Sequence, residues 1–328
     1  MMRSSIIFHL LCLCQAWKLR RYLQSAPRRL WSTSPLTTTD PNTSTKSNRL
    51  QDTDPDLYKL QGRLLKNLRQ TALSYNMLED GDHIMVCVSG GKDSATLWHL
   101  LTLLQEKLPV DFRLTAVHVD QKQPGYDGTV LVNWFREDYP QHDFCVIEED
   151  TYSIVVDKTA PGKSYCTVCS RLRRGILYSK AIELGCNKIT LGHHADDCLE
   201  TLMLNMIHGG QLSAMPARYT SQRGSLGVLR PLIQCWEDDI ATYASSMEFP
   251  ILPCNLCSNQ ANLQRPQMKL LLSSMTALTP TAKINLLQSL HTVKPRHLLD
   301  QNLRTSCGMD PITGEREGDF ATDDDEPI

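Results

Sequence analysis

The run Ser89-Gly-Gly-Lys-Asp-Ser94 constrains the fold and chemistry of this chain more than any other stretch. The apolar residues His83–Val88 precede it and indicate a buried parallel strand, and the apolar periodicity of Ala95–Leu108 predicts a helix after it. A glycine-rich turn between a strand and a helix gathers backbone N–H groups and the positive helix end around an anion. Lys92 adds a positive charge and Ser94 a hydroxyl, so the sequence predicts a phosphate-binding loop.

The spacing within this run differs from the Gly-x-x-x-x-Gly-Lys-Ser/Thr spacing of the Walker loop. It resembles the PP-loop of the ATP pyrophosphatases, which adenylate a substrate and release pyrophosphate. An ordinary glycine-rich turn is the alternative, and the intact six-residue run in a strand–helix setting disfavours it. We therefore expect ATP binding by Ser89, Gly90, Gly91, Lys92, Asp93 and Ser94.

Strand and helix patterns alternate along the middle of the chain. After an amphipathic helix over 57–76 we expect further strands at 112–119, 143–148 and 188–191, with helices at 130–139, 173–184 and 196–207. This alternation predicts an α/β fold with a doubly wound parallel sheet. The resemblance of the loop implies that the sheet is of the PP-loop ATP pyrophosphatase type. Ligands of such sheets bind outside the carboxyl ends of the strands. From residue 270 helical patterns dominate and predict a small C-terminal helical appendage.

The two ends of the chain differ from its centre. Residues 1–39 hold six basic and no acidic residues, and Ser and Thr dominate 32–47, which is typical of a mitochondrial transit peptide. A secretory signal and a disordered cytosolic arm are the alternatives. We expect a transit peptide and linker over 1–48, the PP-loop domain over 49–268, a helical region over 269–314 and a disordered acidic tail over 315–328.

Net charge and hydropathy limit the kinds of partner that we expect this chain to bind. The formal net charge is −2, and the core is close to neutral once the basic N-terminal region and the acidic tail are set aside. Such a core does not attract nucleic acid in bulk, so any RNA needs a local basic patch. No apolar run approaches the roughly 20 residues that span a membrane, so we expect no membrane partner. We expect the matrix of mitochondria as the location, with the cytoplasm as the alternative.

Polar side chains follow two of the predicted strands. Asp120 follows one strand directly, where it can meet a nucleotide or its metal ion, although an ordinary turn aspartate is as good an interpretation. His193, His194, Asp196 and Asp197 follow another strand and open a helix. They can serve metal, phosphate or acid–base chemistry, and an aspartate here can also simply cap the helix.

Two C-x-x-C pairs, Cys166/Cys169 and Cys254/Cys257, are a strong metal signal. Spacing alone favours a structural zinc ion held by four thiolates. An iron–sulfur cluster with an open iron, or a redox pair that carries a persulfide, would fit too. The first pair continues into a basic stretch, and its cations can grip RNA phosphates or form an exposed helix face: Arg171, Arg173 and Arg174.

Further motifs occur in one order along the chain: Cys166–Tyr178, Gly192–Asp197, Asn205–Gly210, Met215-Pro216, Arg230–Leu232, Pro253–Cys257 and His297–Leu303. From Leu57 to Leu303 the chain resembles the tRNA 2-thiocytidine synthetases, or tRNA-cytidine 2-sulfurtransferases. The resemblance implies an enzyme that uses ATP and Mg²⁺ to adenylate the C2 oxygen of cytidine 32 in the tRNA anticodon loop. Sulfur transfer by way of a [4Fe–4S] cluster would then form 2-thiocytidine.

Carried over by motif, the resemblance implies cluster ligation by Cys166, Cys169 and Cys254, with Cys257 close by. We assign catalysis to Lys92, Asp93 and Asp197, and nucleotide contacts also to Asp120 and His193. The expected partners are tRNA and a sulfur donor such as a cysteine desulfurase, and a homodimer stays open. The alternatives are a PP-loop tRNA 2-thiouridine synthetase that uses zinc and a persulfide, and a non-catalytic zinc or RNA-binding module.

Overall fold

The computed structural model describes residues 54–160, 165–222, 226–252 and 264–316, without the side chains of residues 166 and 167. Contacts within the chain divide it into two compact units, with the boundary between Gln267 and Met268. The first unit carries the sheet, and the second contains helices. None of the helices in the described ranges is long and apolar enough to cross a membrane.

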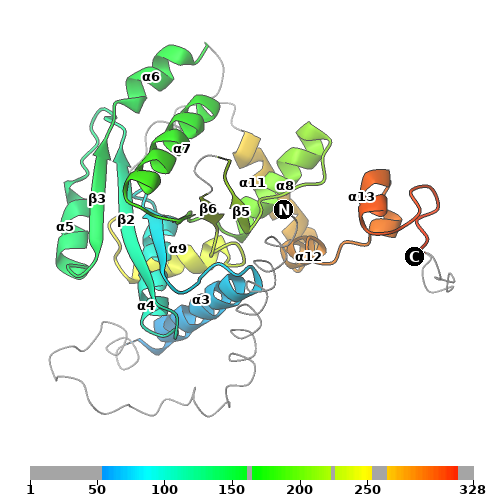
Figure 1. Ribbon diagram of the computed structural model, residues 1–328, viewed down its shortest axis with the longest axis horizontal. Helices are drawn as coiled ribbons and strands as arrows, with labels where there is room; N and C mark the ends of the chain where they lie inside the picture. The colour runs from blue at the N-terminus through cyan, green and yellow to red at the C-terminus, as the bar shows by residue number, and fades with distance from the viewer. Residues whose placement is uncertain (1–53, 161–164, 223–225, 253–263, 317–328) are drawn as a thin grey trace, which may run out of the picture. The chain divides into compact units, whose positions relative to one another are not determined.

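A six-stranded sheet forms the first unit, in the order β3-β2-β1-β4-β6-β5. Five strands run parallel, and β5 runs antiparallel to β6 at one edge (Figure 1). The strands are β1 Asp82–Cys87, β2 Phe112–Asp120, β3 Asp143–Glu148, β4 Lys188–Thr190, β5 Arg218–Thr220 and β6 Gly227–Leu229. The α/β prediction with a mostly parallel sheet is confirmed, whereas the short antiparallel edge was not predicted.

The sheet changes its direction of winding at β1. The chain adds β2 and then β3 on one side of β1, and it returns to place β4 on the other side. Loops that leave the carboxyl ends of β1 and β4 therefore diverge and leave a crevice between them, where ligands of such sheets bind. The phosphate-loop run follows β1, and the two histidines follow β4.

Helices cover the two faces of this sheet. In the first unit they are α3 Pro55–Ser74, α4 Lys92–Gln105, α5 Thr129–Asp138, α6 Thr151–Lys158, α7 Cys166–Glu183, α8 Ala195–Leu204 and α9 Glu237–Ser246, with the π-helix η2 Asn205–Gly209. Leu177 and Ala181 of α7 pack on Met85, Val117 and Ile189 of three neighbouring strands.

The opposite face carries α4 and α5. Phe144 lies one residue before Cys145, which packs on the α7 side, and strand side chains alternate in direction. Phe144 stacks on Phe135 of α5 with ring centroids 4.1 Å apart, and Phe135 lies 5.1 Å from the Trp98 ring of α4. Layers on both faces therefore hold the sheet rigid beneath the crevice.

The second unit consists of short helices. Helix α11, Gln264–Leu278, crosses the boundary between the units, and α12 Ala282–Ser289, the 3-10 helix η3 Pro295–His297 and α13 Gln301–Ser306 follow. Asp300 caps α13 by accepting from the Leu303 backbone N–H at 3.0 Å. Helices dominate here as the sequence indicates, and the exact domain limits stay predictions.

Several expectations need correction. The helix predicted at 173–184 begins at Cys166, so the first thiol pair lies on the first turn of that helix. The sequence analysis missed α6, α9, β5 and β6. Five cysteines on predicted strands and helices are expected to be small buried side chains: Cys87, Cys145, Cys186, Cys198 and Cys235. Cys87 and Cys145 are only half-buried. The others are buried as expected: Cys186, Cys198 and Cys235.

Candidate functional site

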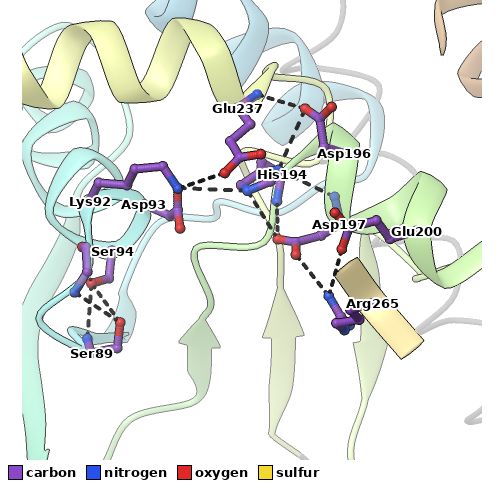
Figure 2. Close-up of polar contacts among 11 residues, drawn as sticks. Ser89, Lys92, Asp93, Ser94, His194, Asp196, Asp197, Glu200, Glu237 and Arg265 are labelled. Atoms are coloured by element: carbon purple, nitrogen blue, oxygen red, sulfur yellow. Dashed lines mark hydrogen bonds and ion pairs between the residues drawn. The ribbon is translucent and has the colours of Figure 1, made fainter. Parts of the chain in front are cut away.

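Hydrogen bonds made by its own serines stabilise the phosphate loop. Ser94 Oγ donates to the Gly91 carbonyl at 2.9 Å and accepts from the Ser89 backbone N–H at 3.0 Å (Figure 2). Gly90 has a φ of 85°, a left-handed conformation that favours glycine. Helix α4 begins immediately afterwards at Lys92, with its unpaired N–H groups and positive dipole end at the loop.

Gly90 also joins this loop to a distant segment. Its carbonyl accepts from the Leu252 backbone N–H at 2.8 Å. A Cβ on Gly90 would lie 3.0 Å from Leu252 Cδ1, so the close approach requires glycine. Leu252 is the last described residue before the segment that carries Cys254 and Cys257, which lies outside the described residues.

The loop after β4 lies against the start of α4. A Cβ on Gly192 would come within 3.1 Å of the Asp93 carbonyl carbon and the Ser94 nitrogen. His194, and neither aspartate, is the N-cap of α8. Its Nδ1 accepts from the Asp197 backbone N–H at 3.4 Å, and the Asp197 carboxylate accepts from the His194 N–H at 3.2 Å.

Charged groups surround Lys92 between these loops (Figure 2). Lys92 Nζ lies 3.1 Å from Asp93 Oδ1 and 3.1 Å from Glu237 Oε1 at the start of α9. Burial disfavours its charge, but the two carboxylates outweigh burial and raise the pKa of Lys92, so the ammonium stays charged. The Glu237 backbone N–H donates to Asp196 at 2.8 Å. Glu237 is a site residue that the sequence analysis missed.

Asp197 has a cationic neighbour, Arg265 at the start of α11. Arg265 Nη1 lies 3.0 Å from Asp197 Oδ1 and 3.4 Å from Glu200 Oε2. His194 Nε2 lies 3.5 Å from Asp197 Oδ2 and 3.8 Å from Asp93 Oδ1 (Figure 2). The structure thus brings the predicted residues Lys92, Asp93 and Asp197 into one polar cluster at the crevice.

The cysteine helix approaches the same crevice from the β2 side. Cys169 is buried, and its Sγ donates to Gln121 Oε1 at 3.4 Å. Arg173 Nη2 donates to Cys169 Sγ at 3.4 Å and to Gln121 Oε1 at 3.3 Å. Arg173 is therefore directed inward to the thiol, whereas Arg171 and Arg174, grouped with it in the sequence analysis, are exposed.

Gln121 connects this thiol to a pocket beside the phosphate loop. The pocket is lined by Ser89, His118, Val119, Gln121, Gln123, Tyr126 and Leu252. Asp120 is not among these residues. It accepts from the Lys122 backbone N–H at 2.8 Å and lies 3.2 Å from Lys122 Nζ, as a turn aspartate does. Its predicted contact with the nucleotide stays a prediction.

His118 is fixed at the base of this pocket. Its Nδ1 lies 2.7 Å from the Val88 carbonyl, and its Nε2 hydrogen-bonds the Tyr126 hydroxyl. A carbonyl can only accept, so the proton of the neutral ring sits on Nδ1. Burial lowers the pKa of His118, which keeps the ring neutral.

The predicted metal ligands are only partly described. Cys166 is the first residue of α7, and Cys254 lies outside the described residues. Among the described side chains, no group of three or more His, Cys, Asp and Glu is arranged to hold a metal ion. Ligation by Cys166, Cys169 and Cys254 therefore stays a prediction.

Comparisons with known proteins agree with this geometry. The PP-loop domain family matches residues 60–251, so fold and site together define a PP-loop protein. The tRNA-cytidine(32) 2-sulfurtransferase of Pseudoalteromonas atlantica is 46% identical over 289 residues, which cover 87% of this chain and 90% of the relative. The enzyme of the same name from Ralstonia pickettii is 47% identical and covers 77% of this chain and 80% of the relative. The chain belongs to the tRNA-cytidine(32) 2-sulfurtransferase family of enzymes, which confirms the resemblance found in the sequence.

Among solved structures, the chain is similar to the U34-tRNA thiolase NcsA from Methanococcus maripaludis with its [4Fe-4S] cluster. The TM-score is 0.56 at 21% identity, and the match covers 72% of this chain and 80% of NcsA. At this identity the likeness shows a shared fold.

Proposed function

We propose that this protein is an ATP-dependent tRNA thiolase that forms 2-thiocytidine at position 32 of the anticodon loop. Membership of the sulfurtransferase family supports the reaction. One observation supports the place of the reaction in the structure. Gln121 lines the pocket at Ser89 and also hydrogen-bonds the Cys169 thiol. One side chain thus contacts both a pocket at the phosphate loop and a cysteine of the C-x-x-C helix.

The nucleotide half of the reaction uses the loop after β1. The backbone N–H groups at the start of α4 and the hydroxyls of Ser89 and Ser94 suit the phosphates of ATP. Lys92 would leave Glu237 for the phosphates, and Mg²⁺ would neutralise their remaining charge. The cytidine C2 oxygen attacks the α-phosphorus, and the bond to pyrophosphate breaks. The adenylated oxygen is now a good leaving group.

In the second half, a sulfide-level sulfur attacks C2 and forms a C2–S bond, the C2–O bond breaks and AMP leaves. A [4Fe–4S] cluster, when bound, supplies a site that holds activated sulfur beside the base. The described residues fit such a group, because the Cys169 sulfur is buried and accepts a hydrogen bond from the Arg173 guanidinium. We propose Cys166, Cys169 and Cys254 as ligands. Leu252, two residues before Cys254, contacts Gly90 of the phosphate loop.

The tRNA would bind beside α7. Arg171 and Arg174 are exposed on this helix and can contact backbone phosphates, while Arg173 faces the thiol. A base inside an anticodon loop is unpaired, so turning it into a pocket costs less than it would in a duplex. A sulfur donor such as a cysteine desulfurase, together with a two-electron reductant, would resupply the site. We propose the mitochondrial matrix as the compartment, with the cytoplasm as the alternative.

A paired assay tests the proposal. Anaerobically purified protein is incubated with ATP and an unmodified tRNA that carries cytidine 32, and pyrophosphate release and 2-thiocytidine are both measured. Lys92→Ala should lower pyrophosphate release by about 100-fold, since it removes a positive charge from the reacting phosphates. Lys59→Ala, which removes an exposed lysine on α3, is the matched control and should leave the rate unchanged.

Wild-type-like pyrophosphate release by Lys92→Ala would overturn the role of the loop. Iron and acid-labile sulfide are measured on the same preparation. Bound zinc without sulfide would overturn the cluster and favour the zinc and persulfide alternative. A protein that neither binds ATP nor thiolates tRNA would favour the RNA-binding alternative.

A further inference from the structure

Arg230 is a buried cation whose contacts are with neutral groups. It lies directly after β6 and is 8% exposed. Its Nη1 donates to the Pro216 carbonyl at 2.6 Å, and its Nε donates to His193 Nδ1 at 3.2 Å. Its guanidinium carbon lies 5.3 Å from the centre of the Tyr219 ring. Burying a charge among neutral partners is unfavourable, which is typical of a residue retained for a specific task.

The hydrogen bond between Arg230 and His193 determines where the imidazole carries its proton. A guanidinium can only donate, so Nδ1 of His193 must present its lone pair. A neutral imidazole then carries its single proton on Nε2. If His193 gained a second proton on Nδ1, two donors would face each other and this hydrogen bond would be lost.

Burial and the charges around His193 also favour the neutral form of its imidazole. Burial is the largest influence and Arg230 the next, and together they lower the pKa of His193 to about 4. Asp197 on α8 opposes them, while Arg265 on α11 and the neighbouring His194 act with Arg230. His193 is therefore neutral throughout the physiological range of pH.

Tyr219 and α7 hold the guanidinium in place. Tyr219 on β5 lies under Arg230, and its hydroxyl is 3.0 Å from the hydroxyl of Tyr178 on α7. The orientation of Arg230 thus depends on the same helix that carries Cys169. On the other side, His193 follows Gly192, whose backbone abuts Asp93 and Ser94 at the phosphate loop.

We propose that Arg230 is a positioning residue that fixes His193 as a neutral imidazole with its proton on Nε2, so that this N–H donates to a phosphate oxygen of bound ATP. The inference rests on the proposed function, because the acceptor is the nucleotide of the thiolation reaction. A neutral donor keeps its proton during adenylation and lets pyrophosphate leave without adding a further full positive charge to the site.

The first test reads the tautomer directly. Full-length protein is labelled with ¹⁵N-histidine, and His193 is assigned by comparison with His193→Gln. We expect ring nitrogen shifts of an Nε2–H tautomer that does not titrate above about pH 5. An Nδ1–H tautomer, or titration of His193 near its ordinary pKa, would overturn the inference. This measurement uses the wild-type protein and needs no active variant.

The second test compares pH profiles of tRNA-dependent pyrophosphate release between about pH 5.5 and 8.5. In Arg230→Met the loss of the cation raises the pKa of His193 toward its ordinary value, so the rate should fall relative to wild type, and fall further as the pH is lowered through that pKa. Arg113→Met, at an exposed pair on the edge of β2, is the matched control and should keep the wild-type profile. A folded Arg230→Met protein with the wild-type profile would contradict the proposal.

Substitutions of His193 distinguish the role of its ring as a hydrogen-bond donor from the role of the space that the ring fills. His193→Gln places an amide N–H near the Nε2 position and should keep the rate within about 10-fold, whereas His193→Phe should lose about 100-fold. Equal rates for the two variants would overturn the donor role. If the wild-type protein releases no pyrophosphate at all, the proposed function fails, while the tautomer measurement still decides the role of Arg230.

Discussion

Gly192 shows how little space separates the two loops of the site. The atoms that a Cβ would meet at 3.1 Å are the backbone of Asp93 and Ser94, which cannot yield without moving the start of α4. Overpacking of this kind costs about 1–3 kcal/mol. We expect Gly192→Ala to weaken ATP binding by roughly 10-fold, as measured by isothermal titration calorimetry.

Gly62→Ala is the matched control for this prediction. Gly62 lies within α3, and a Cβ there would meet nothing within 4 Å. Alanine favours a helix interior over glycine, so this variant should be at least as stable as wild type and bind ATP equally well. Equal ATP affinity of both variants would contradict the close packing at Gly192.

Burial also predicts which thiols are inert. It raises the pKa of Cys235 to about 12, so this thiol stays protonated and unreactive at neutral pH. Iodoacetamide at about pH 8 should spare Cys235 in the native protein and label it after unfolding, as peptide mass spectrometry can show. Half-exposed Cys307 provides the internal control. Native labelling of Cys235 at the unfolded rate would contradict the burial.

At the scale of single residues, the sequence predicts the site only where the chemistry is local. Lys92 and Ser94 belong to one short run, so their neighbourhood follows from the motif. Glu237 and Gln121 reach the site from other elements, through the packing of α9 and through the loop after β2. Their side chains are of ordinary types for a surface or a turn, and no local pattern marks them.

At the scale of elements, β1 and β4 are joined at their amino ends by a buried ion pair. Lys188 and Asp82 are almost fully buried, with Nζ and Oδ2 2.6 Å apart, and Glu79 lies 2.9 Å from the same ammonium. Lys188→Met leaves Asp82 uncompensated, so we expect a loss of about 3–5 kcal/mol in the free energy of unfolding. Urea titration measures this loss.

The exposed pair of Arg113 and Asp143 is the control for this prediction. It joins β2 to β3 with both side chains more than half exposed, so Arg113→Met should cost less than about 1 kcal/mol. A similar cost for both substitutions would show that burial of the Lys188 pair contributes nothing specific.

The boundaries of elements show why part of the fold escaped the sequence analysis. The N-cap residues of helices α7 and α9 are Tyr165 and Trp236, and neither side chain caps its helix, so the usual start signal is absent. Strands β5 and β6 have three residues each, which is too short for an alternating pattern. The longer strands β1 and β2 carry strong apolar patterns, and their prediction is confirmed.

At the scale of the whole molecule, the N-terminal region and the catalytic fold are expected to act separately. Residues 1–48, fused to a fluorescent protein, should direct it to mitochondria, because the segment is basic and lacks acidic residues before Asp40. Replacing Arg28 and Arg29 by serine should weaken import. Microscopy that finds both fusions evenly in the cytosol would contradict the proposed compartment.

The backbone hydrogen bond between Gly90 and Leu252 has a consequence for how the newly synthesised chain folds. It joins residues 90 and 252, and contacts of such long range are slow to form because a long stretch of chain must first be closed into a loop. A nascent or partly folded chain thus lacks a finished cradle for triphosphate. The protein would therefore bind and turn over ATP only after the chain has folded, so that incompletely folded molecules would not consume ATP.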